Sequence, residues 1–133
     1  MIGWLRVATA AALLLAGACV PGDTSSLTER DDGKTVTMHP GEEFQAVLGT
    51  TPKSGFSWVW PGGEKSSVVE PVGKPAFDRD IDEAIRTGAA GNETWRFRAV
   101  KPGRETVRLE YRRPWDDKTP PERTFTFTAE VQP

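Results

Sequence analysis

The chain has 133 residues, a length that predicts one domain. Its formal net charge of -2 at pH 7 excludes the strongly basic footprint of a nucleic-acid-binding protein, and its acidic residues are too scattered to form an acidic tail. With 37% hydrophobic and 27% charged residues, the composition is that of an ordinary globular chain once an export signal is set aside.

The N-terminus has the three parts of a secretory signal. Residues 1–6 carry one positive charge, residues 7–16 are apolar, and residues 15–19 end the run with small side chains and the only cysteine, Cys19. The apolar run is shorter than the roughly 20 residues that span a bilayer. This pattern predicts a signal peptide over residues 1–18.

The segment that ends at Cys19 resembles a bacterial lipobox, in which the cysteine is lipidated and becomes the mature N-terminus. The resemblance implies a lipoprotein of the cell envelope that is anchored to a membrane through Cys19. Residues 19–34 then read as a flexible, polar tether. Ala16-Gly17-Ala18 is also a site for ordinary signal peptidase, which would leave a soluble periplasmic or secreted protein. A single cysteine excludes an internal disulfide in either case.

Residues 35–133 are predicted to form an all-β domain. Apolar and polar residues alternate in short runs that are separated by proline and glycine, and no long helix is indicated. Residues 80–86 are expected to form one helical turn or a loop. The pattern predicts an immunoglobulin-like antiparallel β-sandwich of about seven strands. These strands are expected near residues 34–38, 44–48, 56–60, 68–72, 95–99, 107–111 and 125–131.

Three segments between the predicted strands have the chemistry of specialised loops. They are residues 51–56, 88–91 and 113–115, and they contain Pro-Lys-Ser-Gly, Gly-Ala-Ala-Gly and Arg-Pro-Trp. Alternate loops of a sandwich of this type lie at the same end. We therefore expect the three loops to meet at one tip.

The first loop and the start of the next strand match a known signature without a gap. Residues 51–58 resemble the first binding loop of the chagasin-like inhibitors of papain-like cysteine peptidases, which reads Asn-Pro-Thr-Thr-Gly, then Tyr or Phe, then any residue and Trp. Ser54 is a conservative replacement, whereas Thr51 and Lys53 depart from the pattern. The positions that agree are Pro52, Gly55, Phe56 and Trp58.

The other two loops extend this resemblance to about residues 35–131. The family's second loop is Gly-x-Gly-Gly, and Gly88-Ala89-Ala90-Gly91 keeps two of its three glycines. Ala90 is a departure, and it would be strained if the backbone there required a positive φ. The third family loop is Arg-Pro-Trp, which Arg113-Pro114-Trp115 matches after a strand that ends in an aromatic residue.

The resemblance implies a reversible inhibitor, and not an enzyme, that fills the cleft of a papain-like cysteine peptidase with three loops. It implies a monomer that needs no cofactor or metal. The expected contact residues are Thr51, Pro52, Lys53, Ser54, Gly55, Phe56, Gly88, Ala89, Ala90, Gly91, Arg113, Pro114 and Trp115. The departures leave a second function open, that of a non-inhibitory binding or structural module of the cell envelope.

Simpler structural roles also fit these residues. Phe56 and Trp58 alternate with the core face of their strand, so both could be core residues. The first loop could be a plain turn, residues 88–91 an ordinary flexible loop, and Trp115 could fold back on the edge of the sandwich. An exposed tryptophan, however, has little local reason to be apolar unless a partner binds it.

The residues needed for catalysis or metal binding are scarce. His39 is the only histidine, so a Cys/His nucleophilic pair and a zinc site of the usual ligands are excluded once Cys19 is processed. Residues 78–83 begin like a calcium-binding loop but lack the glycine at its sixth position, and Ala89 stands where the bidentate acid should be. This segment is better explained as a solvated charged loop.

Overall fold

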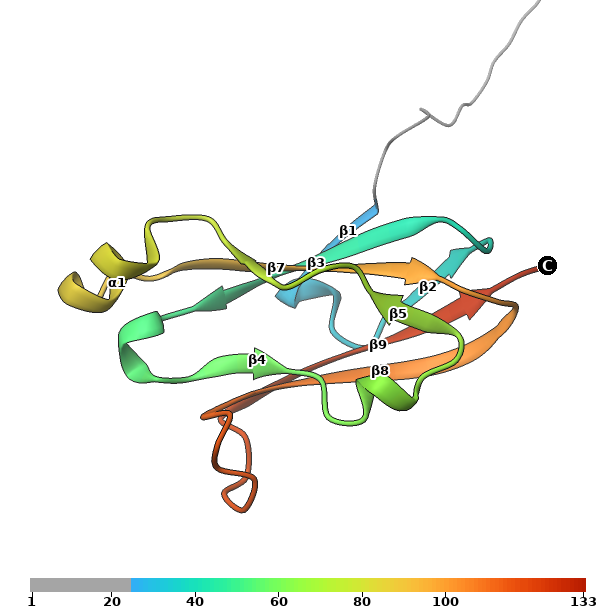
Figure 1. Ribbon diagram of the computed structural model, residues 1–133. Helices are drawn as coiled ribbons and strands as arrows, with labels where there is room; N and C mark the ends of the chain where they lie inside the picture. The colour runs from blue at the N-terminus through green and yellow to red at the C-terminus, as the bar shows by residue number, and fades with distance from the viewer. Residues whose placement is uncertain (1–24) are drawn as a thin grey trace, which may run out of the picture.

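The computed structural model describes residues 25–133, so the predicted signal peptide and Cys19 lie outside the described residues. Two β-sheets pack face to face as a sandwich (Figure 1), which confirms the predicted fold class. The first sheet contains β1 (Ser25–Thr28), β3 (Glu43–Thr50), β7 (Gly91–Ala99) and β5 (Val69–Pro71), and β6 (Ala76–Phe77) pairs with β7. The second sheet contains β2 (Thr35–Met38), β9 (Arg123–Val131), β8 (Gly103–Arg112) and β4 (Ser57–Val59).

Four short helices connect these strands. They are η1 (Glu29–Asp31), η2 (Pro52–Ser54), η3 (Gly63–Lys65) and α1 (Ile81–Thr87). The alternative left open for residues 80–86 is decided in favour of a helix. The Asp80 side chain caps its start by accepting a hydrogen bond from the Glu83 N–H at 3.0 Å. In the part of the chain that the structure describes, no helix is long and apolar enough to cross a membrane.

The core is built from the alternating faces of the long strands. Phe44 of β3, Phe97 of β7 and Phe127 of β9 are fully buried and come from both sheets. Phe44 stacks on Phe97 and meets Phe127 edge-on, each with 5.1 Å between ring centroids. Burial of a large apolar side chain stabilises the fold by about 1.5–3 kcal/mol, so these rings hold the two sheets together without a disulfide.

Strand number and direction differ from the predicted pattern in two respects. Nine strands lie within residues 25–133, because β1 and β6 add to the seven expected. Most pairs are antiparallel, but β1 runs parallel to β3 and β2 runs parallel to β9. Both parallel strands lie at sheet edges, where η1 carries the chain from one sheet to the other.

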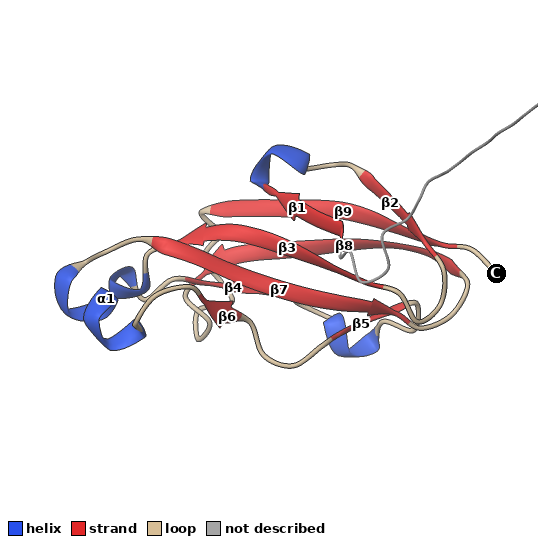
Figure 2. Cartoon of the chain, turned by 90° about the horizontal axis from the view of Figure 1, so that it is seen from above, coloured by secondary structure: helices blue, strands red, loops and turns tan. Residues whose placement is uncertain are grey.

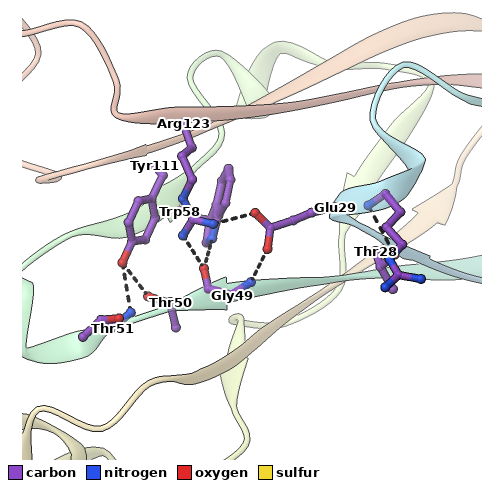
Figure 3. Close-up of polar contacts among 9 residues, drawn as sticks. Thr28, Glu29, Gly49, Thr50, Thr51, Trp58, Tyr111 and Arg123 are labelled. Atoms are coloured by element: carbon purple, nitrogen blue, oxygen red, sulfur yellow. Dashed lines mark hydrogen bonds and ion pairs between the residues drawn. The ribbon is translucent and has the colours of Figure 1, made fainter.

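The flexible tether predicted for residues 19–34 is wrong from Ser25 onward. Leu27 is buried in the core, and the following turn closes through a capping box between Thr28 and Asp31. Glu29 accepts a hydrogen bond from the Gly49 N–H at 3.0 Å and pairs with a β9 arginine at 2.6 Å (Figure 3). The polar composition concealed this strand, because Leu27 is its only apolar residue and a single residue shows no alternating pattern.

The connections that carry the three predicted loops gather at one end of the sandwich. Figures 1 and 2 show α1, the β3–β4 connection and the β8–β9 connection at this end. The C-terminus and the turn between β7 and β8 lie at the opposite end. The topological prediction that the loops share an end is therefore confirmed, and we call residues 51–56, 88–91 and 113–115 together the three-loop tip.

Candidate functional site

The first loop, residues 51–56, is a tight turn held by its own polar groups. Pro52 begins the short helix η2, and Gly55 ends it with φ 81°, a left-handed conformation that glycine adopts without strain. The Ser54 hydroxyl donates to the Thr51 carbonyl at 2.7 Å and accepts from the Phe56 N–H at 3.1 Å. Proline, serine and glycine together give this loop one conformation, which lowers the entropy lost on binding a partner.

A buried tyrosine anchors the first loop to the second sheet. The hydroxyl of Tyr111 on β8 accepts hydrogen bonds from the Thr51 N–H at 3.0 Å and from the Thr50 hydroxyl at 3.3 Å (Figure 3). Nearby, the Trp58 Nε1–H donates to the Gly49 carbonyl at 2.9 Å. Trp58 is therefore a core residue, 3% exposed, and holds the base of the loop instead of projecting from it.

The third loop projects from the end of β8 and has a rigid base. The Asp116 N–H donates to the Arg113 carbonyl at 2.9 Å, which closes a turn around Pro114 and Trp115. The Asp116 carboxylate accepts hydrogen bonds from the Lys118 and Thr119 N–H groups, each at 3.1 Å. Hydrogen bonds from Thr119, followed by that from Lys118, lower the pKa of Asp116, so this carboxylate stays ionised and fixes the segment that follows the turn.

Trp115 does not fold back over the edge of the sandwich. Its side chain is 74% exposed, the largest exposure among the large apolar residues of the described part. A Cβ atom placed on Gly55 would lie 3.4 Å from its ring, so the first and third loops are neighbours. The Arg113 guanidinium lies 4.6 Å from the centre of the half-buried Phe56 ring, which joins the same two loops by a cation–π contact.

The second loop follows α1, and hydrogen bonds hold its backbone at Ala89 and Ala90. Gly88 ends the helix with φ 82°, and its N–H donates to the Ala84 carbonyl at 2.8 Å. The positive φ of this loop therefore falls on Gly88, a residue without a side chain. Ala89 and Ala90 lead from it into β7. A Cβ on Gly88 would lie 3.5 Å from the Lys53 side chain, so the second loop borders the first.

Gly91 has a different role from the glycines of the turns. It is the first residue of β7 and pairs with Thr50 at the end of β3. A Cβ at this position would lie 2.6 Å from the Asp78 carboxylate and 2.7 Å from the Phe77 ring. Its lack of a side chain is therefore required by close packing within the chain itself.

The three loops thus form one continuous surface, whose members are separated in the sequence by β4 to β6 and by β7 and β8. Among residues 25–133, no three His, Cys, Asp or Glu side chains lie close enough together to hold a metal ion. What the tip offers chemically is shape, an exposed indole and a guanidinium, which suit recognition of another protein.

A family model described as "Chagasin family peptidase inhibitor I42" matches residues 37–129. The chain belongs to this family. Amoebiasin-1 of Entamoeba histolytica is 32% identical to it over 108 residues, which cover 80% of this chain and 99% of amoebiasin-1. Chagasin of Trypanosoma cruzi is 29% identical over 100 residues, covering 75% of this chain and 91% of chagasin.

A solved structure shows the same arrangement. The solution structure of amebosin superimposes with a TM-score of 0.60 at 32% identity, covering 84% of this chain and 100% of amebosin. The family predicted from the loop motifs is therefore confirmed. Its members are peptidase inhibitors, so the chain belongs with inhibitors and not with enzymes.

Sequence reasoning left one part of this chagasin-family site undecided and missed another. The first is α1, which precedes the second loop and packs against η2. Its signals are an Asp80 cap, acidic residues in the first turn and Gly88 at the end, but a helix of seven residues is too short for periodicity to establish. The second is the anchoring role of Tyr111, because a strand aromatic gives no sign that its hydroxyl reaches another sheet.

Proposed function

We propose that this protein is a reversible inhibitor of papain-like cysteine peptidases and that its three-loop tip enters the active-site cleft. The observation that carries the proposal is the exposure of Trp115 on a tip formed by three loops, in a chain of the chagasin family. A tryptophan that is 74% exposed between two fixed turns serves no core, and tryptophan is enriched among residues that dominate binding energy.

Each of the three loops supplies a different part of the inhibitory surface. The first loop supplies a narrow, rigid wedge, since Gly55 has no side chain and Pro52 restricts the backbone. Arg113 and Trp115 supply one flank, and the segment from Gly88 supplies the other. No bond forms or breaks in this scheme, so inhibition is stoichiometric and reversible. We expect a monomer that binds one peptidase.

The test is a titration of papain and of a cathepsin-L-like peptidase with the purified protein starting at Val20. Stoichiometric loss of activity that returns on dilution is the expected result. A folded β spectrum without inhibition at micromolar concentrations would contradict the proposal. The family fold would then serve as a non-inhibitory binding or structural module.

We also propose that the protein is exported and anchored in the cell envelope through a lipid on Cys19. The support is the charged start, the apolar run and the small residues before that cysteine. Membrane fractionation of cells that express the full chain tests this, with Cys19→Ser as the variant. Release of the variant into the soluble fraction is expected, whereas a soluble wild-type protein would favour a periplasmic or secreted inhibitor.

A further inference from the structure

An apolar groove of about 230 Å³ lies beside the first loop, and none of the three loop motifs accounts for it. One wall is formed by Pro52 and Phe56 of the first loop. The other is formed by Phe77 and by Ile81 and Ile85 of α1. A partner that rests on the first loop would therefore also cover this groove.

The isoleucines of α1 are more exposed than folding requires. Ile81 and Ile85 lie one helical turn apart on the same face and are 46% and 49% exposed. Ala84, which is 1% exposed, is the residue that holds the helix to the domain. With Phe77 and the first loop they form one contiguous apolar surface and not scattered single residues, which is the pattern of a contact surface continuous with the tip.

A carboxylate also lines the groove. Glu93 on β7 is in phase with Trp95 and Phe97, so it faces the space between the sheets where the sandwich opens toward the tip. The Trp95 Nε1–H donates to it at 2.6 Å. In residues 25–133 no lysine, arginine or histidine lies within 4.0 Å of this carboxylate, and burial raises its pKa.

These features restrict what the groove can hold. A purely apolar occupant would remove Glu93 from water and leave only the hydrogen bonds from the Trp95 indole and the Trp58 backbone to offset the loss, which is unfavourable for a charged group. An occupant with an aliphatic stem and a positive end would bury its stem on Ile81 and Ile85 and neutralise Glu93. We propose that the groove receives a lysine or arginine side chain of the bound peptidase, with its charged end at the Glu93 carboxylate. This inference rests on the proposed inhibitory function.

The test compares inhibition constants at pH 7 for the wild type and three variants. Glu93→Gln keeps an oxygen that accepts the Trp95 hydrogen bond but removes the charge. The double variant Ile81→Ser/Ile85→Ser removes the apolar wall at exposed positions that the fold does not need. Val100→Ser is the matched control, since this residue is 45% exposed on the connection between β7 and β8, away from the tip.

We expect inhibition to weaken about tenfold for Glu93→Gln and to a similar extent for the isoleucine pair, while Val100→Ser leaves it unchanged. Raising the salt concentration should weaken the wild type more than Glu93→Gln, because only the wild type has the ion pair. Thermal unfolding of each variant, monitored by circular dichroism, checks that the fold is kept. If Glu93 had only a structural role, the wild type and Glu93→Gln would show the same salt dependence of inhibition.

The outcomes separate this inference from the proposed function. If the wild type inhibits and both groove variants inhibit equally well, the inference is overturned and the inhibitor stands. If the isoleucine variant lost inhibition and Glu93→Gln did not, the proposal that the occupant is a lysine or arginine side chain would be overturned. If the wild type inhibits no papain-like peptidase, the proposed function fails and the inference fails with it.

Discussion

The two ends of the sandwich expose different kinds of surface. At the three-loop tip, Trp115 is 74% exposed and Ile81 and Ile85 are about half exposed. At the opposite end, the described residues include a single large apolar residue that is about half exposed, Val100, and an ion pair links β8 to β9 there. The same long strands reach both ends, so the difference lies in the connections. It indicates that a partner, and not folding, explains the apolar residues of the tip.

The largest effect is expected for Trp115→Ala. This change removes an exposed anchor, so the inhibition constant should rise by about 30-fold or more, which corresponds to a hot spot of about 2 kcal/mol. Thermal stability should not change, because the indole contributes little to the core. Val100→Ala at the opposite end is the control for inhibition. Equal inhibition by Trp115→Ala and the wild type would exclude Trp115 from the interface.

Tyr111→Phe tests whether the tip depends on its anchor. The ring stays in the core, but the hydroxyl that accepts from the Thr51 N–H is lost. An unsatisfied N–H at this site should lower the free energy of unfolding by about 1–3 kcal/mol. Inhibition should weaken too, since the first loop loses its attachment. Urea denaturation and a peptidase titration measure the two effects, and a variant as stable as the wild type would show that the bond contributes nothing.

A pair of glycine substitutions compares the two ends directly. Gly55 and Gly41 have φ of 81° and 92°, and Gly41 lies in the turn before β3 at the end away from the tip. Alanine at either position should lower stability by about 1–2 kcal/mol, because an L residue is strained there. Only Gly55→Ala should also weaken inhibition, because the strained backbone and the added methyl group, 3.4 Å from the Trp115 ring, both lie within the tip. Equal weakening by both variants would trace the effect to stability alone.

The smallest expected effect is on the pH dependence of stability. Burial raises the pKa of Glu93 in the folded state, so the native protein binds more protons than the unfolded chain as pH rises from its ordinary pKa of about 4.3 to the raised value. Stability from this group is therefore lost as pH rises through that window. The stability of Glu93→Gln minus that of the wild type should therefore be larger at pH 7 than at pH 4. Melting curves at both pH values measure the difference, and a constant difference would show that Glu93 titrates normally.

Alternating residues made the long strands predictable. β3, β8 from Val107 and β9 from Phe125 place every second side chain in the core, which is the direct consequence of the two-residue period of a strand. Proline and glycine likewise predicted where the first loop turns, because Pro52 and Gly55 restrict or permit backbone angles locally. The strand β1 was not predicted and α1 was left open as a helical turn or a loop, because both are short and mostly polar and distant contacts hold them in place.

By itself, the sequence determined the sandwich, the position of the three loops at one end and the family, because each follows from local patterns. Only the tertiary structure decided that Leu27 belongs to the core and that Glu93 faces a groove beside α1. It also decided that residue 91 must be glycine, because the Phe77 ring occupies the space of a side chain there. These features depend on contacts between segments that lie far apart in the chain. A local pattern cannot specify them, because the same residues would suit a solvated loop equally well if nothing packed against them.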